Sequence, residues 1–231
     1  MDSIYTDGTY LLHNPQWHAD DSSWKAAHIA RLLDQNGVHP ASVCEIGCGA
    51  GEILVGLRDR LPAGTRFVGY DISPDAYALC SRKAGPNLEF RFGDLLVDDA
   101  AHFDLAMAID VFEHVEDCFS FLRRLRTKAR YKVFHVPLEL SALMVARASP
   151  LLEQRRSVGH IHHFSKETAL ALLEDTGYRV IDHFYTSGRT ELGGLGWKTK
   201  LLKWPREALF RADPDAAARI LGGYSLMVLA E

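Results

Sequence analysis

The chain has 231 residues, 47% of them hydrophobic and 24% charged, a composition typical of a globular protein with a sizeable core. A formal net charge of −4 excludes the strongly basic surface that nucleic-acid binding requires, so no nucleic-acid partner is expected. No apolar run approaches the roughly 20 residues that span a bilayer, so no transmembrane segment is expected. The N-terminus lacks a signal peptide, and the four cysteines form no C-x-x-C pair, which indicates reduced thiols and a cytoplasmic protein.

Predicted strands and helices alternate along most of the chain. Residues 1–40 hold several aromatic residues and then a helix from Trp24 to Gln35, which we interpret as an N-terminal helical cap on a domain spanning 41–231. Short apolar runs rich in β-branched or aromatic residues predict strands at 42–47, 66–71, 88–92, 103–109, 131–136, 178–184 and 224–229. Helical patterns are predicted at 51–60, 75–84, 117–129 and from Ser165 to Gly177. This alternation predicts an α/β fold with a doubly wound, Rossmann-like parallel sheet.

Two segments interrupt the alternation, 138–163 and 187–222. Ligands of open α/β sheets bind beyond the carboxyl ends of the strands, so we expect these insertions to build a substrate pocket. The second insertion carries a basic patch whose role stays open between an anionic substrate, a membrane surface and a solvated face: Lys198, Lys200, Lys203 and Arg206.

A glycine-rich turn follows the first predicted strand, from Glu45 to Gly51, and leads into a helix. Glycines allow sharp bends and close approach of a ligand, and the free N–H groups of a helix start favour a negatively charged or carboxylate-bearing ligand. The second strand ends in Asp71, where an acid can accept hydrogen bonds from both hydroxyls of a ribose. Together these features predict a site for a nucleoside cofactor.

Two nucleoside cofactors compete for this turn. NAD favours the spacing G-x-G-x-x-G, but here the spacing is G-x-G-x-G and Glu52 occupies the place of the third glycine. Glu45 places a second acid near the ligand. Acids repel a pyrophosphate and suit the cationic amino and sulfonium groups of S-adenosyl-L-methionine, so the charge pattern favours this cofactor over NAD and an NAD-dependent oxidoreductase.

Four segments resemble, in order and spacing, the motifs of class I S-adenosylmethionine-dependent methyltransferases: Glu45–Gly51, Val68–Ser73, Arg91–Leu96 and Phe103–Val115. The nearest resemblance is to ubiquinone-biosynthesis and bacterial small-molecule O-methyltransferases. It implies a seven-stranded sheet, mostly parallel with an antiparallel last strand. It also implies that the cofactor contacts Glu45, Gly47, Cys48, Gly49, Gly51, Asp71, Ile72, Asp94, Leu95 and Ile109. In this arrangement Glu45 orients the methionine end, Asp71 binds the ribose, Asp94 accepts from the adenine amino group, and Leu95 packs on the ring.

Histidines are the candidate catalytic residues, because transfer to an oxygen requires a base for its proton. His114 follows the fourth strand, and His160, His162 and His163 lie close together in the first insertion. We name His114, His162 and His163 as catalytic candidates. Alternation along an extended segment would place His160 and His162 on one side and His163 on the other.

A metal-dependent alternative rests on a second resemblance. Asp110, Glu113, His114 and His162 are similar in type and spacing to the metal ligands of small-RNA 2′-O-methyltransferases, and the first three to those of some ubiquinone-pathway enzymes. Asp110 departs from the pattern, since the family has Glu there. Such a set would hold Mg²⁺ or Mn²⁺ and lower the pKa of a bound hydroxyl.

Aromatic residues of the N-terminal segment are expected to cover the substrate, with Tyr5, Tyr10, Trp17 and Trp24 as candidate substrate-binding residues. The resulting hypothesis is methyl transfer to a hydroxyl, in preference to an amine, of a small molecule such as a quinone precursor, natural product or sugar. The alternatives are an oxidoreductase and a cofactor-binding module without turnover. The oligomeric state stays open.

Overall fold

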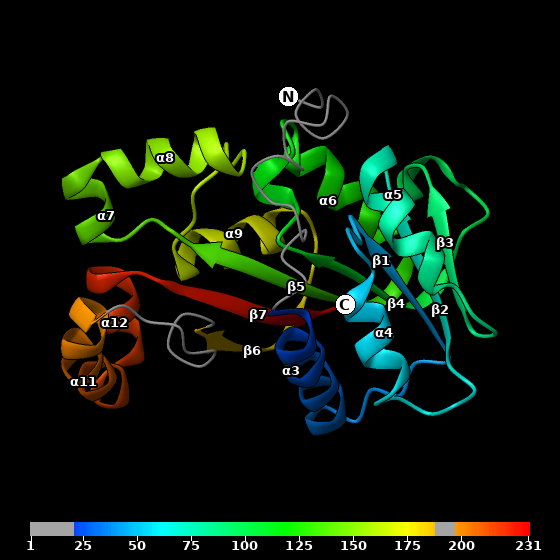
Figure 1. Cartoon of the computed structure of the whole chain (residues 1–231), viewed down its shortest axis with the longest axis horizontal. Coiled ribbons are helices and arrows are strands. Elements are labelled where there is room, and N and C mark those ends of the chain that lie inside the picture. The colour runs from blue at the N-terminus through cyan, green and yellow to red at the C-terminus, as the bar shows by residue number, and fades with distance from the viewer. Residues whose placement is uncertain (1–20, 188–196) are drawn as a thin grey trace.

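A seven-stranded sheet in the order β3-β2-β1-β4-β5-β7-β6 forms the centre of the protein (Figure 1). The computed structural model of the chain describes residues 21–187 and 197–231. The strands are β1 (Ser42–Ile46), β2 (Arg66–Asp71), β3 (Leu88–Phe92), β4 (Phe103–Ile109), β5 (Ala129–Leu138), β6 (Val180–Thr186) and β7 (Tyr224–Ala230). Strands β1 to β5 pair in parallel, whereas β7 runs antiparallel to both β5 and β6. The predicted Rossmann-like sheet with its antiparallel last strand is confirmed.

Some helices of the described chain cover the two faces of this sheet, and others lie at one end of the molecule. The helices are α3 (Ser22–Gln35), α4 (Glu52–Arg58), α5 (Pro74–Cys80), α6 (Cys118–Arg126), α7 (Ala142–Arg147), α8 (Ser149–Ser157), α9 (Lys166–Asp175), α11 (Trp197–Ala212) and α12 (Pro214–Leu221). The side chains of Ser73 and Ser165 accept hydrogen bonds at the starts of α5 and α9, as their sequences predict. The predicted helices 75–84 and 117–129 are too long. The first gives way to a short 3₁₀ turn at Ser81–Lys83, and the second ends at Arg126, before β5 begins at Ala129.

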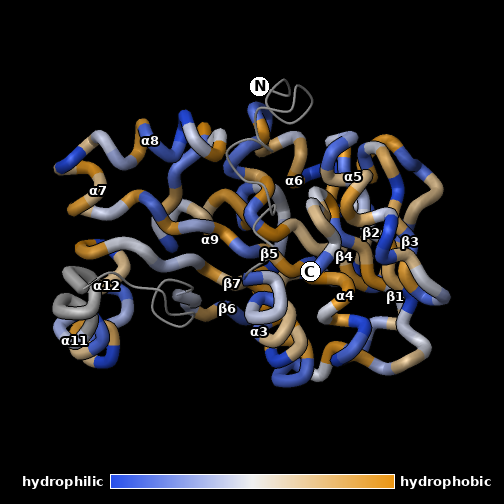
Figure 2. Tube along the Cα trace, viewed as in Figure 1, coloured by the Kyte–Doolittle hydropathy of each residue, from blue (hydrophilic) through white to orange (hydrophobic). Residues whose placement is uncertain are grey.

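Alternate residues of each central strand point to opposite faces and divide the core into two layers. In β4, Leu105 and Met107 pack with α3 and α4, while Ala106 and Ala108 pack with α6 and α9. Hydrophobic residues are correspondingly concentrated in the central strands (Figure 2). A continuous apolar run in the sequence therefore marks a strand that is buried on both faces.

Helix α3 is part of this core, although its sequence was interpreted as a cap separate from the domain. Ile29, Leu32 and Leu33 are almost completely inaccessible and pack with residues of α4 and the sheet. The predicted boundary at residue 40 therefore does not separate two cores. The first twenty residues of the predicted cap lie outside the described part of the chain.

The two predicted insertions form helices at one end of the molecule, on the left in Figure 1. Helices α7 and α8 follow β5, α11 and α12 precede β7, and α7 contacts α12. Within the described ranges no helix is both long and apolar enough to cross a bilayer.

The packing of α3 gives a stability prediction. Ile29→Ala removes a completely buried side chain, so we expect the free energy of unfolding to fall by about 2–5 kcal/mol, measured by urea denaturation. The control Val97→Ala alters a side chain that is 69% exposed and should change it by less than about 0.5 kcal/mol. Equal effects of the two substitutions would show that α3 is a detachable cap.

Candidate functional site

The glycine-rich turn between β1 and α4 lies across the carboxyl end of β2. The backbone N–H groups of Gly47 and Cys48 donate to the Tyr70 carbonyl, at 2.8 and 3.1 Å. Gly47, Gly49 and Gly51 all have left-handed backbone angles, with φ of 68°, 54° and 79°. A Cβ on Gly51 would lie 2.6 Å from the Phe90 ring. Both the conformation and the close packing therefore require glycine here.

A cavity of about 1220 Å³ opens beside this turn at the carboxyl ends of the strands. Its walls include the predicted cofactor residues Glu45, Gly47, Cys48, Gly49, Gly51, Asp71, Ile72, Asp94 and Ile109. Leu95 was predicted to pack on the adenine ring, but it is completely buried in the core. Leu96 lines the cavity in its place, because Asp94 caps a 3₁₀ turn that directs Leu95 inward.

Glu45 is the most unusual group in the cavity wall. Its carboxylate is 2% exposed, and its Oε2 has no hydrogen-bond partner among the described residues. Burial raises the pKa of the Glu45 carboxyl well above its ordinary value, although the nearby charge of Lys25 opposes the shift. An unpaired buried carboxylate at a cavity wall is suited to a cationic ligand group, which would complete its hydrogen bonds.

Asp71 is held rigidly at the end of β2. Its two oxygens accept from the backbone N–H groups of Gly49 and Ser73, both at 2.8 Å. These bonds fix the carboxylate against the glycine turn and leave further lone pairs for a ligand. Burial raises the pKa of Asp71, and the backbone donors oppose the shift.

Glu52 lies at the start of α4, where the sequence predicts that it repels a phosphate. In the structure its carboxylate pairs with the Lys83 ammonium at 2.7 Å. Glu45 therefore disfavours a pyrophosphate ligand more than Glu52 does, because Lys83 offsets the charge of Glu52.

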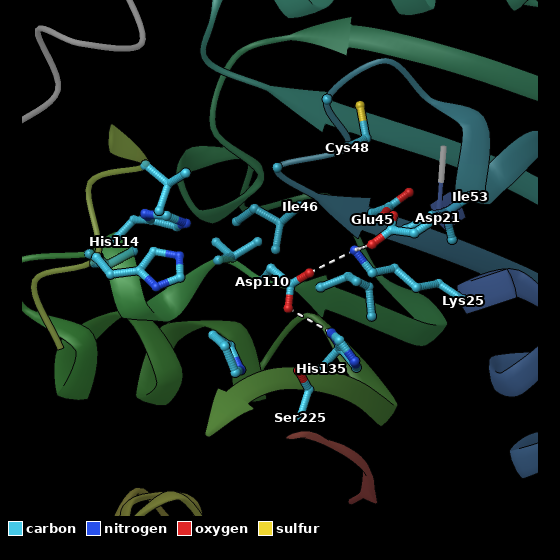
Figure 3. Close-up of a pocket in the computed structure, with 18 of the residues that line it drawn as sticks. Asp21, Lys25, Glu45, Ile46, Cys48, Ile53, Asp110, His114, His135 and Ser225 are labelled. Carbon is cyan, nitrogen blue, oxygen red and sulfur yellow. Dashed lines mark hydrogen bonds and ion pairs between the residues drawn. The ribbon is translucent and has the colours of Figure 1, made fainter. Parts of the chain in front are cut away.

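A charged network that the sequence did not predict connects α3 to the site (Figure 3). Lys25 Nζ lies 2.8 Å from both Asp110 and Asp21, and His135 Nδ1 lies 2.6 Å from Asp110 Oδ1. His135 Nε2 is in turn 2.8 Å from the Thr186 hydroxyl. Burial opposes ionisation of Asp110, but the charges of His135 and Lys25 hold the pKa of its carboxyl well below the ordinary range.

Asp110 occupies a strained position with φ 54°, just after β4. Aspartate tolerates this left-handed region better than most residues. Its short side chain is committed to Lys25 and His135, so it is not available to the metal set predicted from the sequence.

The histidine cluster is arranged differently from the prediction. His160 lines the cavity, and its ring meets that of His114 edge to face at 4.7 Å between centroids. His162 Nε2 lies 2.9 Å from the Val115 carbonyl, and neither His162 nor His163 lines the cavity. The segment is not an extended strand, so the expected alternation fails. Of the three clustered histidines, only His160 therefore reaches the cavity wall.

Glu139, which follows β5, joins two of these histidines. Its Oε1 lies 2.9 Å from His160 Nδ1, and its Oε2 lies 2.6 Å from His163 Nδ1. Burial opposes ionisation, but these contacts lower the pKa of Glu139. The carboxylate therefore orients His160 so that its Nε2 is available to other groups.

Beneath these rings Glu113 is completely buried, and both of its carboxylate oxygens lack a hydrogen-bond partner among the described residues. Burial raises the pKa of Glu113 well above its ordinary value. One ligand atom each from Glu113, His114 and His160 lie within 4.8 Å of one another. Burial and the neighbouring His160 lower the pKa of His114 to about 4.

Trp24 lines the cavity from α3, as the sequence predicts for a substrate-side aromatic residue, and its ring contacts that of His135. Tyr5, Tyr10 and Trp17 lie outside the described residues. The predicted insertions also reach the cavity, through Leu143, Met144 and Arg147 of the first and Arg206 and Leu221 of the second. The side chains of Lys198, Lys200 and Lys203 are not among those described.

Comparison with protein families decides between the nucleoside cofactors. A family model described as a methyltransferase domain matches residues 17–183. The chain belongs to this methyltransferase family. S-adenosyl-L-methionine is therefore the cofactor, and the oxidoreductase alternative is set aside.

Solved structures share the fold of this methyltransferase at low sequence identity. Magnesium protoporphyrin IX methyltransferase from Synechocystis PCC 6803, with bound S-adenosylhomocysteine, is 17% identical with a TM-score of 0.60, covering 90% of this chain and 82% of that one. The N-methyltransferase NodS from Bradyrhizobium japonicum WM9, also with S-adenosylhomocysteine, is 15% identical with a TM-score of 0.55, covering 88% and 83%.

A third structure is a complex between the Haloferax volcanii Trm112 methyltransferase activator and a methyltransferase. It matches at 18% identity and a TM-score of 0.64, covering 97% of this chain and 94% of that one. At these identities the similarity establishes a shared fold. The substrates of these proteins are not assigned to this chain.

Proposed function

We propose that this methyltransferase transfers the methyl group to a hydroxyl oxygen of a small molecule, in preference to an amine. The observation that carries the proposal is the pair of imidazoles, His114 and His160, on the wall of the cofactor cavity. Transfer to a hydroxyl requires removal of its proton, and a neutral imidazole is a common general base for such a proton. Glu139 supports this role because it fixes the orientation of His160.

The residues beside the glycine turn fit the cofactor. We assign the unpaired Glu45 carboxylate to the amino group of its methionine end and Asp71 to the ribose hydroxyls. Asp94 accepts from the adenine amino group, with Ile72 and Leu96 against the ring. The backbone of Gly47, Gly49 and Gly51 leaves space along the ligand.

When bound, the cofactor would supply a methyl group carried on a sulfonium sulfur, and this sulfur would keep the electron pair of the bond that breaks. The acceptor oxygen forms the new bond to carbon, and the imidazole of His160 or His114 holds the hydroxyl proton. The protein contributes alignment of the acceptor and exclusion of water, which together lower the barrier without a covalent enzyme intermediate. His114 is neutral near pH 7 because burial lowers its pKa to about 4.

The outer cavity indicates the kind of acceptor. Leu143, Met144 and Tyr224 offer apolar contacts, while Arg147 offers a positive charge. A planar or elongated apolar body with a polar or anionic group fits these walls, as quinone precursors and other phenolic natural products do, while a sugar is a less apolar candidate.

Cysteine placement supports a cytoplasmic location. Cys44, Cys48, Cys80 and Cys118 are all buried free thiols. Such thiols persist in a reducing compartment.

Binding of S-adenosylhomocysteine should strengthen as pH rises above the ordinary titration range of a glutamate, because burial raises the pKa of the Glu45 carboxyl in the free protein and this carboxyl must lose its proton to pair with the ligand ammonium. Glu45→Gln should weaken binding about tenfold to a hundredfold and flatten this pH dependence. Calorimetry as a function of pH measures both effects. Glu52→Gln is the matched control, since Glu52 pairs with Lys83. An unchanged pH dependence in Glu45→Gln would remove Glu45 from the ammonium site.

His160→Ala should lower turnover about 10²-fold or more while leaving the affinity for S-adenosylhomocysteine within about twofold, because the imidazole acts on the acceptor proton and not on the cofactor. The assay follows transfer of radiolabelled methyl from the cofactor to a panel of phenols, sugars and amines. Exposed His102 provides the control, and His102→Ala should retain full activity. Methylation of amines alone would overturn the proposed hydroxyl acceptor.

A metal-dependent O-methyltransferase is the second candidate, and a specific observation favours it. The buried Glu113 carboxylate has no hydrogen-bond partner among the described residues and approaches His114 and His160. A carboxylate and two imidazoles suit Mn²⁺ or Mg²⁺, and Glu139 on His160 Nδ1 provides the outer contact typical of histidine ligands. The set differs from the sequence prediction, since His160 replaces His162 and Asp110 is engaged elsewhere.

Calorimetric titration with Mn²⁺ separates the two candidates. The metal-dependent mechanism predicts one bound ion per chain and at least about tenfold weaker binding by Glu113→Gln, because the buried carboxylate is the only anionic ligand of the set. Activity should then be lost in EDTA and restored by Mn²⁺. The absence of binding, or equal binding by Glu113→Gln, would leave the imidazoles as bases without a metal.

A further inference from the structure

Large apolar side chains are exposed mainly at one end of the molecule. Of the ten exposed large hydrophobic residues among those described, six lie within 140–152 or 204–220, the segments that form or adjoin the insertion helices. Trp204 of α11 is 76% exposed, and Leu152 of α8 is 52% exposed. A large patch of exposed apolar side chains on a folded protein usually marks an interaction surface.

Helices α7 and α8 are unusual in a second respect, since neither contains a buried residue. Together they carry three leucines, a methionine and a valine. A helix with this composition normally buries one side against the core. Here Leu143 and Val145 of α7 remain 43% and 51% exposed, so this surface is available to a partner outside the chain.

Basic residues accompany the exposed apolar ones. Arg147 stands one helical turn after Leu143, and Arg155 and Arg156 stand one turn after Leu152. All three arginines are exposed and have no ion-pair partner among the described residues. Long basic side chains beside apolar ones suit the boundary between acyl chains and phosphate groups.

The insertion helices carry more basic than acidic residues, in contrast to the chain as a whole. Although the net charge is −4, residues 142–157 and 204–212 carry five basic residues against two acidic ones, Glu153 and Glu207. Four of the five arginines are exposed. Positive charge is thus concentrated at the same end as the exposed apolar residues, and the partner should be anionic.

We propose that α7, α8 and α11 form a docking surface for an anionic lipid bilayer, and that the methyl acceptor enters the cavity from that bilayer. These helices line the outer cavity through Leu143, Met144, Arg147 and Arg206, so the proposed docking surface and the acceptor cavity are continuous. Figures 1 and 2 show them at one end of the molecule, away from β2, β3 and α5. The entry of an acceptor rests on the proposed function, whereas the bilayer contact does not.

The test uses the full-length protein and sedimentation with large vesicles. We expect binding to phosphatidylcholine vesicles that contain phosphatidylglycerol, and at least about tenfold weaker binding to phosphatidylcholine alone, because each basic residue near an anionic surface contributes about 1 kcal/mol. Raising NaCl from about 0.1 M to about 1 M shortens the Debye length from about 10 Å to about 3 Å and should weaken binding.

Two variants probe the surface without altering the cavity wall. Leu152→Ser with Arg156→Glu, and separately Trp204→Ser, should each reduce vesicle binding at least about fivefold, while the affinity for S-adenosylhomocysteine stays unchanged. The matched control is Val97→Ser with Arg82→Glu, which changes exposed residues of the same kinds near β3 and α5. This control should bind vesicles as the unaltered protein does.

Vesicle and cofactor measurements distinguish the two proposals. Cofactor binding without vesicle binding, or equal binding to neutral and anionic vesicles, would overturn the docking surface and leave the methyltransferase function intact. Vesicle binding without cofactor binding would overturn the cofactor-site assignments and leave the bilayer contact. Equal loss of vesicle binding in the control and the surface variants would also overturn the proposal, since it would show a non-specific charge effect.

Discussion

The order of the strands reverses between β1 and β4, and the whole site depends on this reversal. Chain segments that leave these two strands pass to opposite faces of the sheet, so a crevice opens between their carboxyl ends. Glu45 and the glycine turn reach the crevice from β1, and Asp110 and His114 reach it from β4. Asp71 and Glu139 join them from the neighbouring strands. Residues that are far apart in the sequence meet here because parallel strands end at one edge.

Charge gives this crevice two chemically different ends. On one side the acids Asp21, Glu45 and Asp110 surround the single ammonium of Lys25 (Figure 3). Lys25 pairs with two of them and leaves Glu45 Oε2 unpaired. A cluster of three acids around one ammonium disfavours a phosphate and suits the cationic groups of S-adenosyl-L-methionine. On the other side the imidazoles of His114 and His160 line the cavity.

Helix α3 and the insertions determine the outer shape of the cavity. Helix α3 contributes Lys25 and Trp24 to the wall while its apolar face completes the core, so cofactor-site geometry is coupled to domain stability. The insertions are attached differently, with α7 and α8 burying no residue. Core packing therefore places little constraint on the side chains of α7 and α8. Their exposed residues can vary without loss of core contacts. The low identity of the solved structures, 15–18%, is consistent with a sheet maintained by its apolar pattern.

Local patterns in the sequence were sufficient to predict the sheet and the glycine turn, and they indicated most of the residues that line the cavity beside this turn. A doubly buried strand needs a continuous apolar run, and a tight turn needs glycines with left-handed angles, so both features are visible without tertiary contacts. Only the tertiary structure decided which of the remaining residues reach the cavity and which residues they pair with. The 3₁₀ turn after Asp94 exchanges Leu95 for Leu96, and an irregular loop selects His160 over His162. Lys25, His135 and Glu139 gain their roles from partners that are distant in sequence, and no local period encodes such pairings.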